Sequence, residues 1–353
     1  MKQAITALLS TMVVADTLIW EDNFDKLDFN KWQHEITMGG GGNWEFEVYR
    51  NNRTNSFVKD STLFLKPTTT ADALTEESMM YGDYNIWGSN PADQCTSNAF
   101  WGCERNAAAS GNWINPIMSS RLRTVNSFST TYGRVEITAQ LPKGDMIWPA
   151  IWMLPKNNEF GNWPASGEID IVESRGSDGA TCAAGGNDAF ASTLHWGPNW
   201  DSDAYIQTST QYVHHESLAD AMHVYGLIWT EDRLTTYIDS PENVVLDVDM
   251  STQSFWEKGG WTGFNPWNGE ANNAPFNREF YLILNVAVGG TNGYFPDGDC
   301  GKTYTDNDPR APNTFWSTKD TWMPTWNPDS NDSAMKVDSI KVWSLDEDSV
   351  FLQ

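Results

Sequence analysis

YGRVEITAQL, residues 132–141, is the stretch that decides the fold class of this chain. Apolar and polar side chains alternate along it, with Val135, Ile137, Ala139 and Leu141 on one face and Arg134, Glu136, Thr138 and Gln140 on the other. Successive side chains of a β-strand point to opposite faces, so this alternation predicts a strand with one buried face and one face in water.

Similar patterns recur on both sides of this stretch, in SSRLRTV (119–125), HVYGLIWTED (223–232), RLTTYID (233–239), NVVLDV (243–248) and MKVDSIKVW (335–343). FYLILNVAVGG (280–290) is instead continuously apolar, which predicts a central strand. Glu231 and Asp232 stand between two strand-like runs and predict a hairpin turn. Sustained helical periodicity is absent after the first residues, so we expect an all-β sandwich of two antiparallel sheets.

Three long stretches, 68–116, 250–278 and 291–333, lack the strand pattern and are rich in small, polar or tryptophan residues. Because tryptophan is rare in linkers, we interpret them as long loops that frame a cleft. No repeat and no boundary for a second domain is visible, so residues 16–353 are predicted to form one domain.

GEIDIVES, residues 167–174, places three acids on one strand-like stretch with apolar residues between them. In a regular strand Glu168 and Asp170 would share a face and Glu173 would point the other way. A β-bulge near 171–172 would bring Glu173 onto the face of the first two acids, and bulges are common beside active sites. The alternative interpretation is a charged strand edge that discourages aggregation.

Closely packed carboxylates repel, and two carboxyl groups with separated pKa values are what cleavage of a glycosidic bond requires. Two glutamates on one strand favour the short carboxyl separation of roughly 5–5.5 Å that belongs to retaining glycosidases, rather than the roughly 6.5–9.5 Å of inverting ones. Asp170, between them, would hold a hydrogen bond or a proton and so tune the charge of one glutamate.

Several motifs together resemble glycoside hydrolase family 16, in its laminarinase (endo-β-1,3-glucanase) branch. They are WEDNF (20–24), WPAIWMLP (148–155), NWPASGEIDIVES (162–174), LHWG (194–197), FYLILNVAVGG (280–290) and VDSIKVW (337–343), in the family's order and rough spacing. The resemblance covers nearly the whole chain after the N-terminus. It implies a jelly-roll β-sandwich with a concave substrate cleft and hydrolysis by double displacement with retention.

The resemblance also implies roles for single residues. Glu168 matches the nucleophile, Asp170 its supporting acid and Glu173 the general acid/base. The residues expected to bind substrate are Trp148, Trp152, Trp163, His195, Arg53 and Asn55. Sugar rings stack on aromatic faces, and some of the loop tryptophans, Trp113, Trp267, Trp316, Trp322 and Trp326, are expected to build outer subsites. For each tryptophan a place in the core is the alternative.

The segment NWEFEVYRNNRTNSFVKDSTLFLKP (43–67) resembles invertebrate members in particular, which include digestive glucanases and β-1,3-glucan recognition proteins of innate immunity. The recognition proteins typically lack the two catalytic glutamates, and this chain has both. The resemblance therefore favours a glucanase that hydrolyses laminarin-type polymers. A glucan recognition protein, or a hydrolase of mixed-linkage β-glucan, is the alternative, and the sequence leaves endo or exo action, transglycosylation and a digestive or immune role open.

The formal charge of −25 excludes nucleic acid as a partner, because its phosphates would be repelled. The same charge disfavours sulfated or carboxylated polysaccharides, so a neutral β-glucan is the compatible substrate, bound by a protein that we expect to be monomeric. Solubility of a secreted protein is a second explanation of the charge.

Residues 1–15 carry Lys2, an apolar run and a small-residue site that ends at Ala15, which predicts a signal peptide cleaved after Ala15 and a secreted protein without a membrane segment. An oxidising compartment favours disulfides among the four cysteines. Cys95 with Cys103 would close a small loop, and Cys182 and Cys300 would then pair or remain free.

The expected catalysis requires no cofactor. Family members often carry a structural Ca²⁺ away from the cleft, held by the N- and C-terminal strands, and Asp338 matches one such ligand position. Asn23 stands where an acid is common, which weakens the expected site, although Asp22 or backbone carbonyls would offer oxygen ligands.

Overall fold

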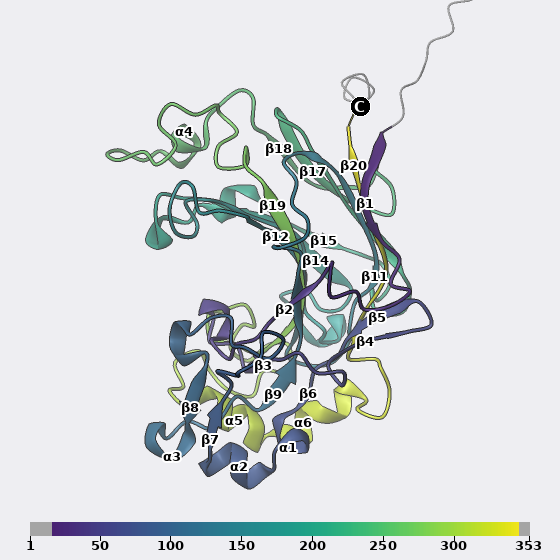
Figure 1. Ribbon diagram of the computed structural model, residues 1–353, viewed down its shortest axis with the longest axis vertical. Coiled ribbons are helices and arrows are strands. Elements are labelled where there is room, and N and C mark those ends of the chain that lie inside the picture. Colours follow the sequence, from purple (N-terminus) through teal and green to yellow (C-terminus); the bar gives the residue numbers. More distant parts are fainter. Residues whose placement is uncertain (1–15, 346–353) are drawn as a thin grey trace, which may run out of the picture.

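The computed structural model describes residues 16–345 and shows two antiparallel β-sheets packed face to face (Figure 1). The predicted signal peptide, 1–15, lies outside the described residues. The predicted all-β jelly-roll-like sandwich is confirmed, and the observed order of strands shows how the sequence is distributed between the two layers.

The larger sheet has eight strands in the order β18-β17-β16-β11-β20-β5-β4, with β1 added beside β20. Its members are β1 (Thr17–Asp22), β4 (Ser56–Lys59), β5 (Thr62–Leu65), β11 (Gly133–Gln140), β16 (His223–Trp229), β17 (Arg233–Ile238), β18 (Val244–Asp249) and β20 (Met335–Ser344). The alternation predicted for 132–141 is observed, because buried and half-buried residues alternate through all of β11. The hairpin predicted at Glu231–Asp232 connects β16 to β17.

The second sheet has seven strands in the order β15-β14-β13-β12-β19-β10-β2. They are β2 (Gln33–Glu35), β10 (Arg121–Arg123), β12 (Ile147–Pro155), β13 (Glu168–Ser174), β14 (Ala189–His195), β15 (Ser209–Val213) and β19 (Phe280–Val288). Every residue of β19 is buried, and the strand pairs with β12 on one side and β10 on the other, as its continuous apolar sequence predicts.

Smaller elements surround the sandwich. A three-stranded sheet contains β3 (Glu47–Tyr49), β6 (Thr68–Thr69) and β9 (Ile117–Ser119), in which β3 and β9 are parallel, and β7 (Asp83–Asn85) pairs with β8 (Glu104–Asn106). The long stretches predicted to be loops also contain short helices: α1 (Thr70–Ala73), α2 (Glu76–Tyr81), α3 (Ala107–Ser110), α4 (Phe255–Gly259), α5 (Ala311–Ser317) and α6 (Lys319–Trp322). All except α4 gather at one end of the sandwich (Figure 1).

Most of the loop tryptophans belong to the core rather than to outer subsites. Trp267, Trp316, Trp322 and Trp326 are at most 4% exposed, and Trp113 is partly buried against the same core. Trp322 stacks on Phe315 with ring centroids 4.3 Å apart, so α5 and α6 present an apolar face to the sandwich. The expectation that some of these residues bind sugar is wrong for the four buried ones, because their rings are already covered by protein.

The bulge predicted near 171–172 is present in β13. Asp170 pairs with Thr193 and Glu173 with Ala191, so two residues of β13, Ile171 and Val172, stand opposite one residue of β14. The pairing with β12 shifts at the same place. A single inserted residue reverses the side-chain alternation beyond it, so Glu173 returns to the face of Glu168 and Asp170.

Two disulfides form, Cys95–Cys103 and Cys182–Cys300, which confirms the predicted first pair and the pairing alternative for the second. Cys182 follows β13 and Cys300 follows β19, and the pair spans 118 residues of sequence. The same region is tied to the site by Arg175, which donates to the backbone oxygens of Tyr294 at 2.8 Å and Ala184 at 3.0 Å.

Removing Cys182–Cys300 with two alanine substitutions is expected to lower the free energy of unfolding by about 2–5 kcal/mol, because the crosslink restricts the unfolded chain. Removing Cys95–Cys103, which spans 8 residues, is expected to cost about 2 kcal/mol less by the same loop entropy. Urea unfolding followed by tryptophan fluorescence measures both double variants. Equal losses, or a larger loss for the shorter loop, would contradict the expected dependence on loop length.

Within residues 16–345, the helices are all too short or too polar to cross a bilayer.

Candidate active site

A long cleft runs across the exposed face of the seven-stranded sheet, and each of its seven strands contributes lining residues. Its volume is 1540 Å³, larger than the roughly 300–1,000 Å³ of ordinary small-molecule pockets. Polar side chains and tryptophans share the lining. A cleft of this size and composition fits several consecutive units of a polymer.

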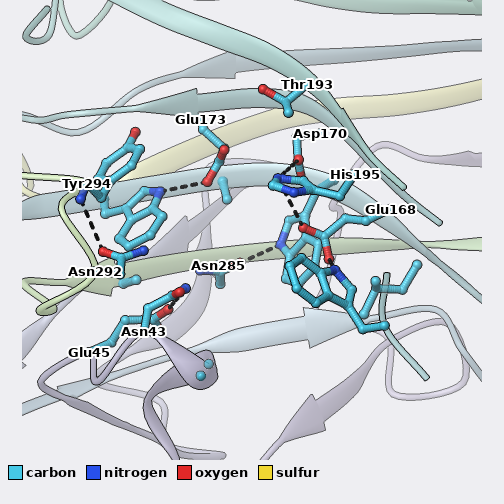
Figure 2. A pocket seen from close by; sticks show the side chains of 18 of the residues that line it. Asn43, Glu45, Glu168, Asp170, Glu173, Thr193, His195, Asn285, Asn292 and Tyr294 are labelled. Atoms are coloured by element: carbon cyan, nitrogen blue, oxygen red, sulfur yellow. Dashed lines mark hydrogen bonds and ion pairs between the residues drawn. The ribbon is translucent and has the colours of Figure 1, made fainter. Parts of the chain in front are cut away.

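The three acids of β13 meet in this cleft (Figure 2). Glu168, Asp170 and Glu173 all line it, as the bulge requires, and the alternative of a charged strand edge is therefore excluded for this stretch. The residues between them, Ile169 and Ile171, are buried in the hydrophobic core. The bulged strand thus places its acids on the cleft face of the sheet and its apolar residues on the core face.

Each glutamate accepts a hydrogen bond from one tryptophan of the cleft. Trp163 donates its indole N–H to Glu168 Oε2 at 3.0 Å, and Trp148 donates to Glu173 Oε1 at 3.0 Å. One face of Trp148 is covered by Tyr294, with ring centroids 3.7 Å apart and planes 6° from parallel. The two indoles therefore fix the orientation of the carboxyl groups.

His195, on β14, connects the acids. Its Nε2 lies 3.3 Å from Asp170 Oδ2 and 3.9 Å from Glu168 Oε1, and its Nδ1 lies 2.6 Å from Asp203 Oδ2. Asp203 is itself oriented by the backbone N–H groups of Trp196 and Tyr205. The imidazole is thus held on both sides by carboxyl groups, at the centre of the acidic cluster.

Burial raises the pKa of Glu168 and of Glu173, and the neighbouring Asp170 raises each of them further. Burial also raises the pKa of Asp170. Burial alone would lower the pKa of His195, but its hydrogen bonds to Asp170 and Asp203 hold that pKa well above its usual range. At neutral pH the cluster therefore contains an imidazolium and carboxyl groups that retain protons.

This arrangement can hold one glutamate ionised and the other protonated. Two buried, mutually repelling carboxylates do not ionise together as readily as isolated ones, so a proton remains in the site. The imidazolium of His195 lowers the pKa of both glutamates, so it stabilises a single negative charge on either member of the pair. A carboxylate beside a carboxylic acid is the protonation state from which a retaining glycosidase starts.

Comparison with known proteins identifies the family. The sequence model of glycosyl hydrolases family 16 matches residues 112–280. A β-1,3-glucan-binding protein of Penaeus monodon is 48% identical over 337 residues, covering 93% of this chain and 90% of that protein. The chain belongs to glycosyl hydrolase family 16.

A further relative is named as a β-1,3-glucanase, and a solved laminarinase has the same fold. A glucan endo-1,3-beta-glucosidase of Cryptopygus antarcticus is 31% identical over 275 residues, covering 77% of this chain and 80% of that protein. The laminarinase of Rhodothermus marinus has the same fold, with a TM-score of 0.58 at 24% identity and coverage of 94% and 99%. The predicted laminarinase-like membership is confirmed.

Of the other family 16 positions predicted to bind substrate, Trp152 lines the cleft but Arg53 and Asn55 do not. Trp152 donates to Asn285 Oδ1 at 2.6 Å. Asn55 is 1% exposed and its amide donates to the backbone oxygens of Lys66 and Met118. Its Nδ2 is used to join loops.

Arg53 also makes protein contacts. Its guanidinium donates to Ser56 Oγ and lies 5.2 Å from the ring centre of Phe29. The expectation of direct sugar contact is wrong for Asn55, which is buried. Arg53 is exposed but lies outside the residues that line the cleft, and its role stays a prediction.

The calcium ion expected in family 16 has no complete set of side-chain ligands around Asp338. Asp338 is exposed on β20, and the carboxylate of Asp22 already accepts from Trp32 Nε1 at 2.8 Å and lies 3.5 Å from Lys31 Nζ. Among the described residues, no group of three or more potential side-chain ligands includes Asp338. The expected site also includes backbone carbonyl ligands, so calcium stays a prediction.

Several cleft residues were not predicted from the sequence. Asp203 is eight residues from His195 in an irregular segment, and Tyr294 reaches Trp148 from a loop after β19, so neither contact has a periodic signal. Trp44 and Trp200, which are 48% and 73% exposed, also line the cleft. Asn43 and Glu45 point into it from the segment before β3, and only the motif at 43–67 indicated that region (Figure 2).

Replacing Asp203 with asparagine is expected to lower kcat/KM on laminarin by about 10- to 100-fold, the effect of losing one charge-assisted hydrogen bond of about 1.5–3 kcal/mol. Loss of the Asp203 charge lowers the pKa of His195, so the imidazolium is lost at lower pH, the pKa of both glutamates rises and the pH profile moves up. A pH profile of kcat/KM measures this. Asp201→Asn makes the same charge change in the cleft at an exposed neighbouring position. An unchanged profile for Asp203→Asn would show that Asp203 does not act through His195.

Proposed function

We propose that this protein is a secreted, retaining endo-β-1,3-glucanase that hydrolyses laminarin-type polymers. The observation that carries the proposal is the bulge in β13, which directs Glu168 and Glu173 into one polymer-sized cleft, each bound by its own indole N–H. A strand without the bulge would present only one of them. The pair provides the two carboxyl groups that double displacement needs.

In the first step, the Glu168 carboxylate attacks the anomeric carbon while Glu173 protonates the glycosidic oxygen, and the bond to the leaving sugar breaks. In the second step, Glu173, now ionised, takes a proton from water, and the resulting hydroxyl group displaces Glu168 from the sugar. The enzyme returns to its starting protonation state. Asp170 and His195 hold the two glutamates in position through both steps.

The substrate class follows from charge and from the relatives. The formal charge of −25 and the acids of the cleft repel anionic polysaccharides, which leaves neutral glucans. The named relatives include a β-1,3-glucan-binding protein and a glucan endo-1,3-beta-glucosidase, and these names support a β-1,3 linkage. The open cleft supports attack within a chain rather than at its end.

The second candidate is a β-1,3-glucan recognition protein, favoured by the name of the Penaeus monodon relative at 48% identity. Such a protein requires binding without turnover. The buried glutamate pair weighs against it, because burying a second carboxyl group beside the first is unfavourable and a binder gains nothing from that second group.

Reducing-sugar release from laminarin, lichenan and agarose, measured side by side with the purified protein, tests the proposal. Release from laminarin well above release from lichenan, and none from agarose, is expected. Tight binding of laminarin without release would establish the recognition protein, and faster release from lichenan would establish a mixed-linkage enzyme. The size of the early products separates endo from exo action.

Secretion is part of the same proposal. The two disulfides require an oxidising compartment, and the first 15 residues have the composition of a leader. Sequencing the N-terminus of protein recovered from the medium of a eukaryotic host should find it near Asp16. We also propose that the secreted protein acts as a monomer, which its mass in solution would test.

A further inference from the structure

Two histidines and an aspartate meet away from the cleft, at a place where the two sheets approach one another. His214 follows the edge strand β15 of the cleft sheet, whereas His223 begins β16 and Asp239 follows β17 of the other sheet. One ring nitrogen of each histidine and one oxygen of Asp239 all lie within 4.8 Å of one another. None of the three lines the cleft, so the proposed function leaves this cluster unexplained.

The hydrogen bonds of the cluster determine which ring nitrogens carry lone pairs. His223 Nδ1 lies 2.9 Å from Asp239 Oδ2, and a carboxylate only accepts, so Nδ1 carries the proton and Nε2 has the lone pair. His214 Nδ1 lies 3.0 Å from the backbone oxygen of Glu216 and accepts the backbone N–H of the same residue at 3.2 Å, so the backbone occupies Nδ1 and leaves Nε2 for an ion. Both rings therefore present Nε2 as a free ligand atom.

The arrangement around His223 has the form of a metal ligand with its supporting carboxylate. Histidines that bind metals usually donate their second ring N–H to a carboxylate or carbonyl, which fixes the ring and increases its basicity. Asp239 is itself held, because its Oδ1 accepts the backbone N–H of Val224 at 3.0 Å. The imidazole rings of His214 and His223 are 5.0 Å apart, close enough for one ion to bind both.

We propose that His214 and His223 bind one divalent transition-metal ion of the Zn²⁺ class, with Asp239 orienting His223 and supplying the compensating negative charge. Imidazole nitrogen with a carboxylate suits Zn²⁺ and its neighbours, whereas Ca²⁺ and Mg²⁺ require oxygen ligands. Asp239 has a side chain 46% exposed, so water can complete the coordination. The formal charge of −25 attracts cations to the whole surface.

The ion would crosslink the two sheets. His214 and His223 stand at the two ends of the loop that leads from β15 to β16, so a shared metal closes this loop and joins the edge of the cleft sheet to the opposite layer. A metal that binds only the folded chain stabilises it by mass action. Zn²⁺ is therefore expected to raise the thermal unfolding midpoint of the protein.

Isothermal titration of the EDTA-treated full chain, without a histidine tag, with Zn²⁺ tests the proposal. One equivalent is expected to bind, and His214→Ala and His223→Ala are each expected to weaken binding by at least tenfold and to remove the increase in unfolding midpoint. Asp239→Asn is expected to weaken binding by about 10- to 100-fold, as loss of a supporting carboxylate does elsewhere. His215→Ala, an exposed neighbour outside the cluster, is the matched control and should bind normally.

The cleft offers a competing site, because Glu168, Asp170 and His195 also form a group of potential ligands. Titration of His195→Ala distinguishes the two, since the proposed site requires binding to survive that substitution. Absence of stoichiometric binding, or unchanged binding in both His214→Ala and His223→Ala, would overturn the proposal. Binding that is lost only in His195→Ala would overturn it as well. Thermal unfolding of each variant in EDTA shows that the substitutions leave the fold intact.

Discussion

Replacing Glu168 with glutamine is expected to abolish hydrolysis of β-1,3-glucan while the protein stays folded and still binds the polymer. Glutamine has nearly the same shape and can keep a contact with the Trp163 indole, but it cannot form the covalent glycosyl intermediate. Turnover should fall by at least about 10²–10⁴-fold, which is the usual contribution of a general acid or base. Reducing-sugar release from laminarin measures the loss, and affinity electrophoresis in laminarin measures the binding.

The same substitution is expected to leave stability unchanged or higher. Burial and Asp170 raise the pKa of Glu168 in the folded protein, so the folded state holds a proton that the unfolded chain releases at lower pH. The stabilisation by this proton is fully present below the ordinary pKa of a glutamate. It is lost as the pH rises through the raised pKa of Glu168 in the folded protein. A neutral glutamine avoids that loss, so the difference between variant and wild type should grow with pH across this range.

The matched control is Glu45→Gln, which makes the same chemical change at another wall of the cleft. It is expected to retain turnover, because Glu45 comes from the segment before β3 and is separate from the acids of β13. Wild-type turnover in Glu168→Gln would show that Glu168 is not the nucleophile. Loss of laminarin binding in the same variant would show that its carboxylate is needed to hold the polymer.

Local patterns were sufficient to predict the strands and the acidic stretch of the cleft. Alternation in 132–141 depends only on neighbouring residues, and the same is true of the bulge, because three acids could share the cleft only if one residue were inserted between Asp170 and Glu173. The disulfide between Cys95 and Cys103 is similarly local. These features can be predicted without knowing which elements pack against them.

Features that depend on long-range packing were not predictable in the same way. Trp316 and Trp322 are buried because α5 and α6 pack on the end of the sandwich, and no periodicity in 291–333 shows that face. Asn55 has the chemistry of a sugar ligand, but its amide is used by two backbone carbonyls. Asp203 contacts His195 from an irregular segment, and such a contact leaves no spacing in the sequence.

Replacing Glu173 with glutamine is expected to stop hydrolysis of laminarin, but not the first step on a β-glucoside whose leaving group is already a weak base, which is the release of 2,4-dinitrophenolate. The natural sugar leaves only when its oxygen is protonated, whereas the dinitrophenolate leaves without help, so Glu168 still forms the glycosyl intermediate. Turnover of laminarin should fall by about 10²–10⁴-fold, the usual contribution of general acid/base catalysis.

Azide then distinguishes Glu173 from Glu168 by the product. In Glu173→Gln the covalent intermediate accumulates, and azide, which needs no general base, attacks it with a second inversion and gives the β-glycosyl azide at a restored rate. Glu168→Gln forms no such intermediate, so azide in that variant can only give the α-product by direct displacement. NMR of the anomeric proton identifies which azide forms.

The pH profile provides an independent check on Glu173. Burial and Asp170 raise the pKa of Glu173, so wild-type kcat/KM on laminarin should persist to higher pH than an ordinary carboxylic acid would allow and then fall as the proton is lost. On the dinitrophenyl substrate this alkaline limb should be absent from the glycosylation rate of Glu173→Gln, because glutamine has no proton to lose. If the alkaline limb persists in Glu173→Gln, the group that causes it is His195 or Asp170 rather than Glu173. If Glu173→Gln gives the α-azide, the roles of the two glutamates are the reverse of those proposed.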